Sequence, residues 1–386
     1  MAKKRFRQRG RRRGGQRDQR LAKEVRQLYD GGDTDDAWTE YLGDDLAENP
    51  TVVAARGTRS KSSTPPDIPE PDGPRRDGTV VSLASGLAWI EPDAPDELLA
   101  EGDLTVDDLP LLCILPTALA QDQQSRIAVG DRIVFARHGD DHRVIEVRPR
   151  RTFLARPDPL NPRQRRVVVA NVDTIVQVAS VRRPPLRPAL VDRYLVAIQQ
   201  GGAEPILCVN KIDLVPETER AQALEPLAPH RDLIQVLPIS AETGEGVEAL
   251  RRCLAGKIAA FVGHSGVGKS SLINALDPAV GAKTGAVSAA LSKGRHTTTR
   301  SSLYELGDGI RVVDTPGIRE LGLADLSAEE LREYFPDLAE LSAGCRFSNC
   351  THDHEPRCAV RTAVETGELA ASRYATYLRI LASLSP

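Results

Sequence analysis

Regular spacing of apolar and polar residues begins near Gly78, and the residues before it show only short helical hints. From there to about Pro149, five short β-like runs are separated by turn residues: TVVSL, LAWIE, LLCIL, DRIVFA and HRVIEV. Runs of this length and composition predict β-strands. Five such strands in succession predict a small β-barrel, and the Gly-Asp turn that feeds the strand in AVGDRIVF fits an OB-fold. A barrel of this type often presents a strand face to nucleic acid, although it can also serve only to pack against a neighbouring domain.

Between about Val167 and Leu326, apolar β-like runs alternate with helix-like stretches such as ALVDRYLVAIQ and KSSLINAL. This alternation predicts a parallel sheet with helices on both faces. The residues after it combine a cysteine and histidine loop with helical runs, among them TAVETGELAASRYATYLRILASL. The strand candidates of the sheet are VVVA, TIVQVASV, PILCVN, LIQVLPIS, IAAFVG and IRVVDT.

Charge is distributed unevenly along the chain, although the net charge is only -3. Residues 1–26 are dominated by Lys and Arg, residues 30–48 are acidic, and a Ser- and Pro-rich run, KSSTPPDIPEPDGP, follows. We expect residues 1–72 to be a disordered extension and linker, because they lack a sustained apolar pattern. A basic arm can attract RNA phosphates through counterion release, but a solvated tail that improves solubility has the same composition.

The composition narrows the class of protein. With 386 residues, of which 40% are hydrophobic, the chain is long enough for two or three domains with ordinary cores. No apolar run approaches the ~18 residues that cross a bilayer, and the arginine-rich start lacks an apolar export signal. We therefore expect a cytoplasmic protein. Cys113, Cys208 and Cys253 are scattered through apolar or helical stretches, as expected for core thiols in a reducing compartment.

The strongest chemical signal is GHSGVGKS at residues 263–270, which matches the phosphate-binding pattern G-x-x-x-x-G-K-[ST]. It follows the strand candidate KIAAFV and leads into the helix candidate SSLINAL. Backbone N–H groups of such a loop face the phosphates, Lys269 adds a charge near the β- and γ-phosphates, and the Ser270 hydroxyl binds Mg²⁺. The predicted nucleotide-binding residues of the loop are Gly263, His264, Ser265, Gly266, Val267, Gly268, Lys269 and Ser270.

The choice of base is predicted from NKID, which follows the strand candidate PILCV. Asp213 can accept hydrogen bonds from N1 and N2 of guanine, which adenine does not supply, and Asn210 can meet the O6/N7 side. Such a site can reject the wrong base by up to ~10⁴ to 10⁵, because the wrong base leaves a polar group unpaired. Further along, PISAETGEG contains the Ser-Ala element that offers a backbone N–H to guanine O6. The predicted base-binding residues are Asn210, Lys211, Ile212, Asp213, Ser240 and Ala241.

A DxxG motif follows the strand candidate IRVVDT. Asp314 is expected to hold Mg²⁺ through water, and the Gly317 N–H to sense the γ-phosphate. Between the two phosphate motifs lies GRHTTTR, in which one of Thr297, Thr298 or Thr299 is expected to close over Mg²⁺. His296 is a candidate for positioning the attacking water, although an ordinary surface or packing histidine explains it as well. The candidate catalytic residues are Lys269, Asp314, Gly317, Thr297, Thr298 and His296.

The motif order is circularly permuted, since NKID and Ser-Ala precede the phosphate-binding loop. The site can still assemble, because every element follows the carboxyl end of a strand in one sheet. A second departure is Ile318, which stands where Ras-like GTPases have the glutamine that orients water. Ile cannot orient a water molecule, so the sequence predicts slow hydrolysis that a partner stimulates.

A metal site is predicted in CRFSNCTHDHEPRC. Three cysteines and one histidine suit a closed tetrahedral structural Zn²⁺ site. The spacing leaves the histidine ligand open between His352 and His354. Zinc would order a loop that has too few apolar residues to fold alone.

Together, the permuted order, GHSGVGKSSL, GRHTTTR, DTPGIRELGL and the cysteine loop with its EPRCAV end resemble the RsgA (YjeQ) family of small ribosomal subunit biogenesis GTPases. The resemblance covers about Gly78 to the C-terminus. It implies a GTPase that acts on the 30S ribosomal subunit and its 16S rRNA late in maturation and is stimulated by that subunit. It also implies nucleotide contacts at 210–213 and 263–270. The implied zinc ligands are Cys345, Cys350, His352 and Cys358.

These inferences predict a multidomain chain. Its expected parts are a basic then acidic extension (1–72), an OB-fold RNA-binding domain (73–152), an α/β P-loop GTPase domain with circularly permuted motif order (153–326) and a small α-helical zinc-binding domain (327–386). We expect a monomer with one structural Zn²⁺, and Mg²⁺ bound with GTP. The extension departs from the compact family core, so its role is open. Two alternatives remain: an RNA-binding assembly module in which GTP is mainly structural, and a permuted GTPase that acts on the large subunit.

Overall fold

The computed structural model describes residues 73–84, 86–102, 104–116, 127–157, 165–277, 302–314, 323 and 326–384. Within these residues two compact units separate. Asp337–Arg379 form one, and the residues before and after them form the other. The larger unit takes in both the region predicted as a barrel and the region predicted as a parallel sheet.

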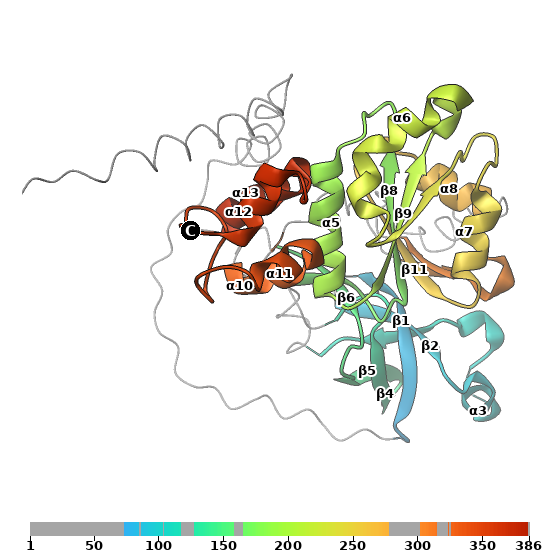
Figure 1. Cartoon of the computed structure of the whole chain (residues 1–386). Coiled ribbons are helices and arrows are strands. Elements are labelled where there is room, and N and C mark those ends of the chain that lie inside the picture. Colours follow the sequence, from blue (N-terminus) through green and yellow to red (C-terminus); the bar gives the residue numbers. More distant parts are fainter. Residues whose placement is uncertain are drawn as a thin grey trace, which may run out of the picture. The chain divides into compact units, whose positions relative to one another are not determined.

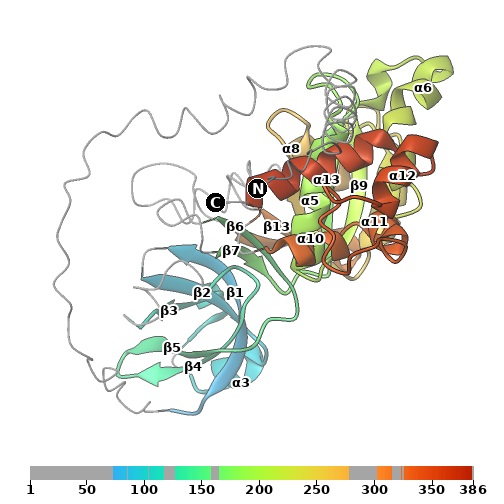
Figure 2. The same ribbon diagram turned by 60° about the vertical axis from the view of Figure 1, so that its left-hand side comes forward.

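The first part of the larger unit is a closed barrel (Figure 2). Hydrogen bonding runs in the order β1-β2-β3-β5-β4, and β1 also pairs with β4, which closes the barrel. Apolar side chains at alternate strand positions fill it, among them Val80, Ile90, Ile133 and Phe135. All the runs predicted as strands here are strands, and a closed five-stranded barrel is consistent with the predicted OB-fold. The elements are β1 (Arg76–Ala84), β2 (Leu87–Pro92), α3 (Pro95–Ala100), a 3-10 turn (Val106–Asp108), β3 (Leu111–Ile114), β4 (Arg132–His138) and β5 (Asp141–Val147).

A polar junction joins the barrel to the following segment. The fully buried Asp131 accepts two hydrogen bonds from the Arg150 guanidinium, at 2.7 and 2.8 Å, and one from the Ala128 amide at 2.7 Å. Next to it, the Gly130 carbonyl accepts a hydrogen bond from the Asn171 side chain at 3.0 Å. Breaking one side of a buried charge pair is costly, so these contacts fix the loop before β4 against the chain that enters the sheet.

An antiparallel hairpin lies between the barrel and the sheet, formed by β6 (Phe153–Pro157) and β7 (Arg165–Ala170). The run VVVA was predicted as a strand of the parallel sheet, and that prediction is wrong, because VVVA lies in β7, which forms a two-stranded sheet with β6. Its one described contact outside that sheet is an isolated bridge from Val169 to Val129. A four-residue apolar run does not specify its partner strand. Here Leu154 and Val169 are paired and both buried, and they share a core with Ile175 of the sheet.

The remaining strands form a mainly parallel sheet in the order β10-β9-β8-β11-β13-β12. Among the described strands of this sheet, only β12 runs antiparallel to its neighbour within the sheet, β13. The sheet and the barrel are continuous, since Ser82 of β1 pairs with Ser302 of β12 and the Arg311 guanidinium pairs with Glu91. The strands are β8 (Thr174–Ser180), β9 (Glu204–Asn210), β10 (Gln235–Pro238), β11 (Ile258–Val262), β12 (Ser302–Glu305) and β13 (Arg311–Asp314).

Helices cover both faces of this sheet, as predicted (Figure 1). On one face α5 buries Val191, Leu195 and Ile198, which recur at helical spacing. On the other face α7 and α8 contribute Leu250, Leu272 and further residues to a second apolar core. These helices are α5 (Pro188–Gln200), α6 (Arg220–Leu224), α7 (Val247–Leu254) and α8 (Lys269–Leu276), with 3-10 turns at Ile212–Leu214, Glu217–Glu219 and Glu225–His230.

The end of the chain is helical, as predicted. A capping box between Ser327 and Glu330 begins α10 (Ala328–Glu333), and α11 (Pro336–Ser342) follows. The long predicted helical run divides into α12 (Ala359–Thr366) and α13 (Ala371–Leu384), because Gly367 adopts a φ of 79° that ends a helix. Across the described residues, no helix combines the length and apolarity needed to cross a membrane.

Replacing Gly130 by alanine is expected to destabilise the junction. Its φ is +91°, and an added Cβ would lie 2.0 Å from the Ala170 carbonyl oxygen. The strain and the clash should lower the free energy of unfolding by about 2 kcal/mol or more, seen as a lower thermal midpoint. Gly139 is the matched control, since its φ is +63° but nothing lies within 4 Å of an added Cβ. Its alanine variant should lose about 1 kcal/mol, and equal losses in both variants would contradict this account.

Candidate nucleotide site and metal centre

The predicted nucleotide motifs meet at one edge of the sheet. The parallel strands β9, β10, β11 and β13 end at Asn210, Pro238, Val262 and Asp314, and a predicted motif follows or includes each of these ends. Strand order reverses between β8 and β11, which is where α/β sheets form a ligand crevice. The motifs therefore converge although their order along the chain is permuted.

The phosphate-binding loop spans the gap between β11 and α8. Gly263 has a φ of 141°, and a Cβ there would lie 2.2 Å from the Val178 carbonyl oxygen, so only glycine fits. Gly268 has a φ of 95° and sits against the Asn210 side chain. Lys269 begins α8, and its Nζ donates to the carbonyls of Gly263 at 2.6 Å and His264 at 3.0 Å. The loop thus places a lysine ammonium and a helix N-terminus together, as binding of an anionic phosphate requires.

Asn210 connects three loops through one side chain. Its Nδ2 donates to the Val267 carbonyl of the phosphate-binding loop at 2.9 Å. Its Oδ1 accepts from the Lys211 amide at 2.8 Å and from the Ala241 amide at 3.0 Å. The side chain is buried, so its amide donor and acceptor are both satisfied by protein.

Lys211 reinforces the same connection. Its backbone is left-handed, with a φ of 65°, which turns the chain sharply out of β9. Its Nζ donates to the Gly266 carbonyl at 2.6 Å and to the Arg183 carbonyl. The ammonium therefore ties the loop after β8 to the phosphate-binding loop.

Asp213 and Ser240, predicted from separate motifs, are in contact. The Ser240 hydroxyl donates to Asp213 Oδ1 at 2.6 Å and accepts from the Thr243 amide at 3.1 Å. Asp213 is exposed, so its carboxylate is accessible from solvent. The pair can present acceptors to the N1–H and N2–H groups of guanine.

Two predicted nucleotide-binding residues have side chains in the apolar core. Ile212 and Val267 are 1% and 3% exposed, so any contact with a nucleotide would come from their backbone. His264 is half-buried, and Ser265, Gly266 and Ser270 are exposed at the rim of the loop.

Most of the predicted switch residues lie outside the described part of the chain: His296, Thr297, Thr298, Thr299, Gly317 and Ile318. Asp314 ends β13, and the structure describes its backbone but not its side chain.

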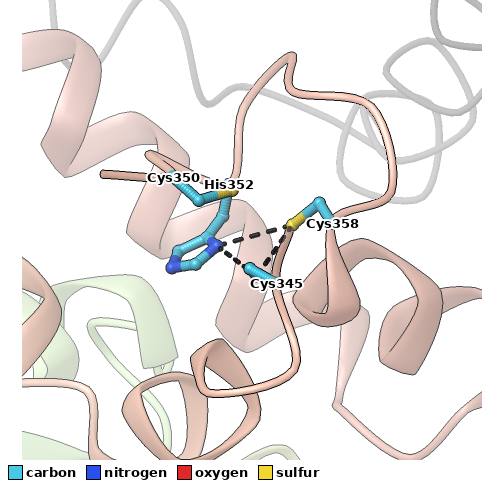
Figure 3. Close-up of side chains that lie close together, drawn as sticks. All are labelled: Cys345, Cys350, His352 and Cys358. Carbon is cyan, nitrogen blue, oxygen red and sulfur yellow. Dashed lines mark hydrogen bonds between the residues drawn. The ribbon is translucent and has the colours of Figure 1, made fainter. Parts of the chain in front are cut away.

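The four predicted metal ligands form a compact cluster, and their ligand atoms lie within 4.8 Å of one another (Figure 3). Cys345 Sγ and Cys358 Sγ are 3.9 Å apart, and they lie 3.6 and 3.4 Å from His352 Nδ1. A tetrahedral Zn²⁺ with ordinary bond lengths has S···S and S···N edges of about 3.8 and about 3.6 Å. These three distances match the edges of a tetrahedral site with Nδ1 as the imidazole ligand, and Cys350 Sγ lies within 4.8 Å of the other three atoms. Of the two histidines that the spacing leaves open, His352 lies in the cluster, whereas the His354 side chain is 79% exposed.

A bound cation would decide the protonation state of two cysteines in the cluster. Burial raises the pKa of the Cys350 and Cys358 thiols, so thiolates there need a compensating positive charge. A bound divalent metal would supply it.

Hydrogen bonds from α13 hold the metal loop. Tyr374 donates to the His352 carbonyl at 2.6 Å, and Tyr377 donates to the Thr351 carbonyl at 3.1 Å. Glu355 accepts from the Thr351 amide at 2.8 Å and hydroxyl at 2.7 Å. Partial burial acts to raise the pKa of Glu355, but these hydrogen bonds outweigh that effect and lower the pKa to about 2. The carboxylate is ionised near neutral pH and fixes the turn that presents His352, whose φ is 63°.

Some residues that support the two sites could not be found from sequence motifs. Tyr374 and Tyr377 belong to a helical run, where an aromatic residue is usually interpreted as part of the apolar core. Near the base motifs, Arg220 pairs with Glu245 at 2.6 Å, although the two residues are 25 positions apart and no motif spans both. Only the fold brings them together.

Comparison with known proteins agrees with this geometry. A family model described as RsgA GTPase matches residues 147–324. The small ribosomal subunit biogenesis GTPase RsgA of Gemmatimonas aurantiaca is 41% identical over 259 residues, which make up 66% of this chain and 83% of the relative. That of Chlorobaculum tepidum is 40% identical over 293 residues, or 73% of this chain and 93% of the relative.

Solved structures are also similar. YjeQ from Thermotoga maritima superposes with a TM-score of 0.60 at 32% identity, covering 80% of this chain and 98% of that one. YloQ, described as a circularly permuted GTPase, gives a TM-score of 0.57 at 27% identity, covering 81% and 96%.

The metal content of the purified chain should differ sharply between a variant of a cluster cysteine and a variant of the nearby exposed histidine. The purified chain is expected to hold about one divalent metal ion, and Cys358→Ser should lose most of it, because a closed site needs all four ligands. His354→Ala should keep it. Metal content measured by elemental analysis of purified variants tests this. Retention of metal by Cys358→Ser, or its loss from His354→Ala, would contradict the ligand set.

Proposed function

Because the chain belongs to the RsgA GTPase family, we propose that it hydrolyses GTP on the small ribosomal subunit during the late maturation of that subunit. Its curated relatives are named small ribosomal subunit biogenesis GTPases. The partner we infer is the 30S particle with its 16S rRNA, in the cytoplasm. The chain acts as a monomer in this proposal.

The observation that supports the proposal most strongly is the hydrogen-bonded convergence of three guanine-nucleotide motifs. Asn210 contacts both the phosphate-binding loop and the Ser-Ala loop, and Asp213 contacts Ser240. An arrangement of this kind offers carboxylate acceptors on the base side and N–H donors with an ammonium on the phosphate side. GTP is the ligand that matches both ends.

Hydrolysis requires little from the protein beyond positioning and charge stabilisation. In our proposal Lys269 moves from its loop carbonyls to the β- and γ-phosphates, while Ser270 and Asp314 hold Mg²⁺. The Gly317 amide senses the γ-phosphate, and a threonine of the GRHTTTR loop covers the ion. Ile318 supplies no hydrogen bond to water, so the ribosomal particle completes the site. His296 remains the candidate for positioning the water.

We assign the metal centre a structural role and its ion as Zn²⁺. Three thiols and one imidazole form the preferred donor set of zinc, and the four ligands leave no open position for a substrate. The residues 327–386 are then a zinc-binding helical domain. The barrel of 73–152 is the RNA-binding domain of the proposal, and its continuity with β12 connects it to the GTPase domain, 153–326.

GTP turnover measured alone and with added 30S or 50S particles tests the proposal. We expect slow turnover alone and stimulation by 30S particles on the order of tenfold or more. Lys269→Ala should abolish both the turnover and nucleotide-dependent release from the particle. Fast turnover alone without stimulation would contradict the role of Ile318. Stimulation by 50S particles would assign the chain to the large subunit. If the Lys269→Ala variant still bound and left the particle in a nucleotide-dependent way, GTP would have a mainly structural role.

Asp213→Asn should change which base is accepted. Asparagine offers an N–H group where guanine also presents donors, so the KM for GTP should rise by about 10²-fold or more. Xanthosine triphosphate, which has an oxygen in place of the 2-amino group, should become a substrate. Asp232→Asn, an exposed aspartate of the same domain, is the control and should change neither value. An unchanged KM for GTP in Asp213→Asn would exclude Asp213 from base recognition.

A further inference from the structure

Arg220 contacts two loops that recognise the base. Its Nη1 and Nη2 donate to the Glu245 carboxylate at 2.6 and 3.1 Å, a bidentate pair. Its Nε lies 3.4 Å from the Val215 carbonyl, at the end of the 3-10 turn that contains Asp213. One guanidinium therefore joins the loop after β9 to the loop after β10.

The Glu245 side of this link leads directly to Ser240. The Ser240 amide donates to the Glu245 carbonyl at 2.9 Å, and the Gly244 amide donates to the Ser240 carbonyl at 2.9 Å. Gly246 closes the turn with a φ of +77°, and a Cβ there would lie 2.5 Å from the Pro238 carbonyl oxygen. The turn is tightly hydrogen-bonded, so a displacement of Glu245 also moves Ser240.

The Val215 side leads to Asp213 in the same way. The Val215 amide donates to the Ile212 carbonyl at 3.0 Å, and the Leu214 amide to the Lys211 carbonyl at 3.1 Å. Asp213 is exposed, and Ser240 Oγ is the hydrogen-bond donor described for its carboxylate. The position of this carboxylate thus depends on the spacing of the two loops, which Arg220 spans.

We propose that Arg220 and Glu245 are positioning residues for guanine selectivity: their bidentate pair sets the distance between the Asp213 turn and the Ser240 loop. The inference rests on the proposed function of the site and extends it to residues outside the nucleotide motifs. Neither residue is a catalytic residue, because neither is placed against the nucleotide or the reacting atoms.

The Arg220–Glu245 ion pair is too exposed to contribute much to the stability of the fold. The side chains are 26% and 47% exposed, and exposed ion pairs contribute little to the stability of a fold. Its bidentate geometry instead restricts orientation. Removing it is therefore expected to change nucleotide selectivity and affinity more than the thermal midpoint.

The experiment compares the affinities of full-length Arg220→Ala, Glu245→Ala and the double variant for GDP and inosine diphosphate by calorimetry. Inosine lacks the 2-amino group, so the ratio of the two affinities reports how well the Asp213 carboxylate is placed. Glu204→Ala is the matched control, since Glu204 pairs with Lys257 at 2.8 Å with side-chain exposures of 58% and 35%, near the amino ends of the same parallel strands. Glu245→Gln keeps the shape of the side chain and serves if an alanine variant unfolds.

We expect the Kd for GDP to rise about threefold to tenfold in both alanine variants, with a fall in the preference for GDP over inosine diphosphate. The double variant should lose no more than Arg220→Ala, and kcat at saturating GTP should change less than about twofold, because the reacting phosphate is untouched. Glu204→Ala should match the wild type. Wild-type affinity and selectivity in Arg220→Ala and Glu245→Ala, or equal losses in the control, would overturn the proposal. If the wild-type chain itself bound no guanine nucleotide, the proposed function would fail before this inference.

Discussion

The proposed nucleotide site depends on one buried side chain that satisfies three backbone groups. Asn210 donates to the phosphate-binding loop through Val267 and accepts from Lys211 and Ala241. A buried amide must have partners for its donor and acceptor, so the three loops can take only positions that supply them. The other contacts, from Lys211 to Gly266 and from Ser240 to Asp213, add to this arrangement.

Circular permutation changes what lies next to this site but leaves the site intact. The parallel strands end at the same edge in any chain order, so the motifs still converge. What changes is connectivity: the barrel now precedes the base-recognition motifs, and the metal-binding region follows the strand that ends at Asp314. Edge strand β12 pairs with β1 of the barrel, and Arg311 of β13 pairs with Glu91. Two strands of the GTPase sheet are thereby attached directly to the barrel.

The loop of residues 345–358, which carries the candidate metal ligands, has little apolar core of its own. Cys345, Cys350, His352 and Cys358 lie within a short segment whose intervening residues are mainly polar and exposed. Hydrogen bonds from Tyr374 and Tyr377 fix the backbone of the loop from a helix further along the chain. A divalent ion bound by the four ligands would provide the stabilisation that apolar burial does not supply there.

The sequence by itself determined the barrel strands, the phosphate-binding loop, the base motifs and the three cysteines of the candidate metal site, because each depends on residues close together in the chain. Local patterns set strand period, loop glycines and ligand spacing. The tertiary structure decided what links distant segments. It placed VVVA in a hairpin with β6, chose His352 over the exposed His354, and brought Arg220 to Glu245. An apolar run does not name its partner strand, and a charged residue does not name its counterion, since both are fixed only when the backbone is folded.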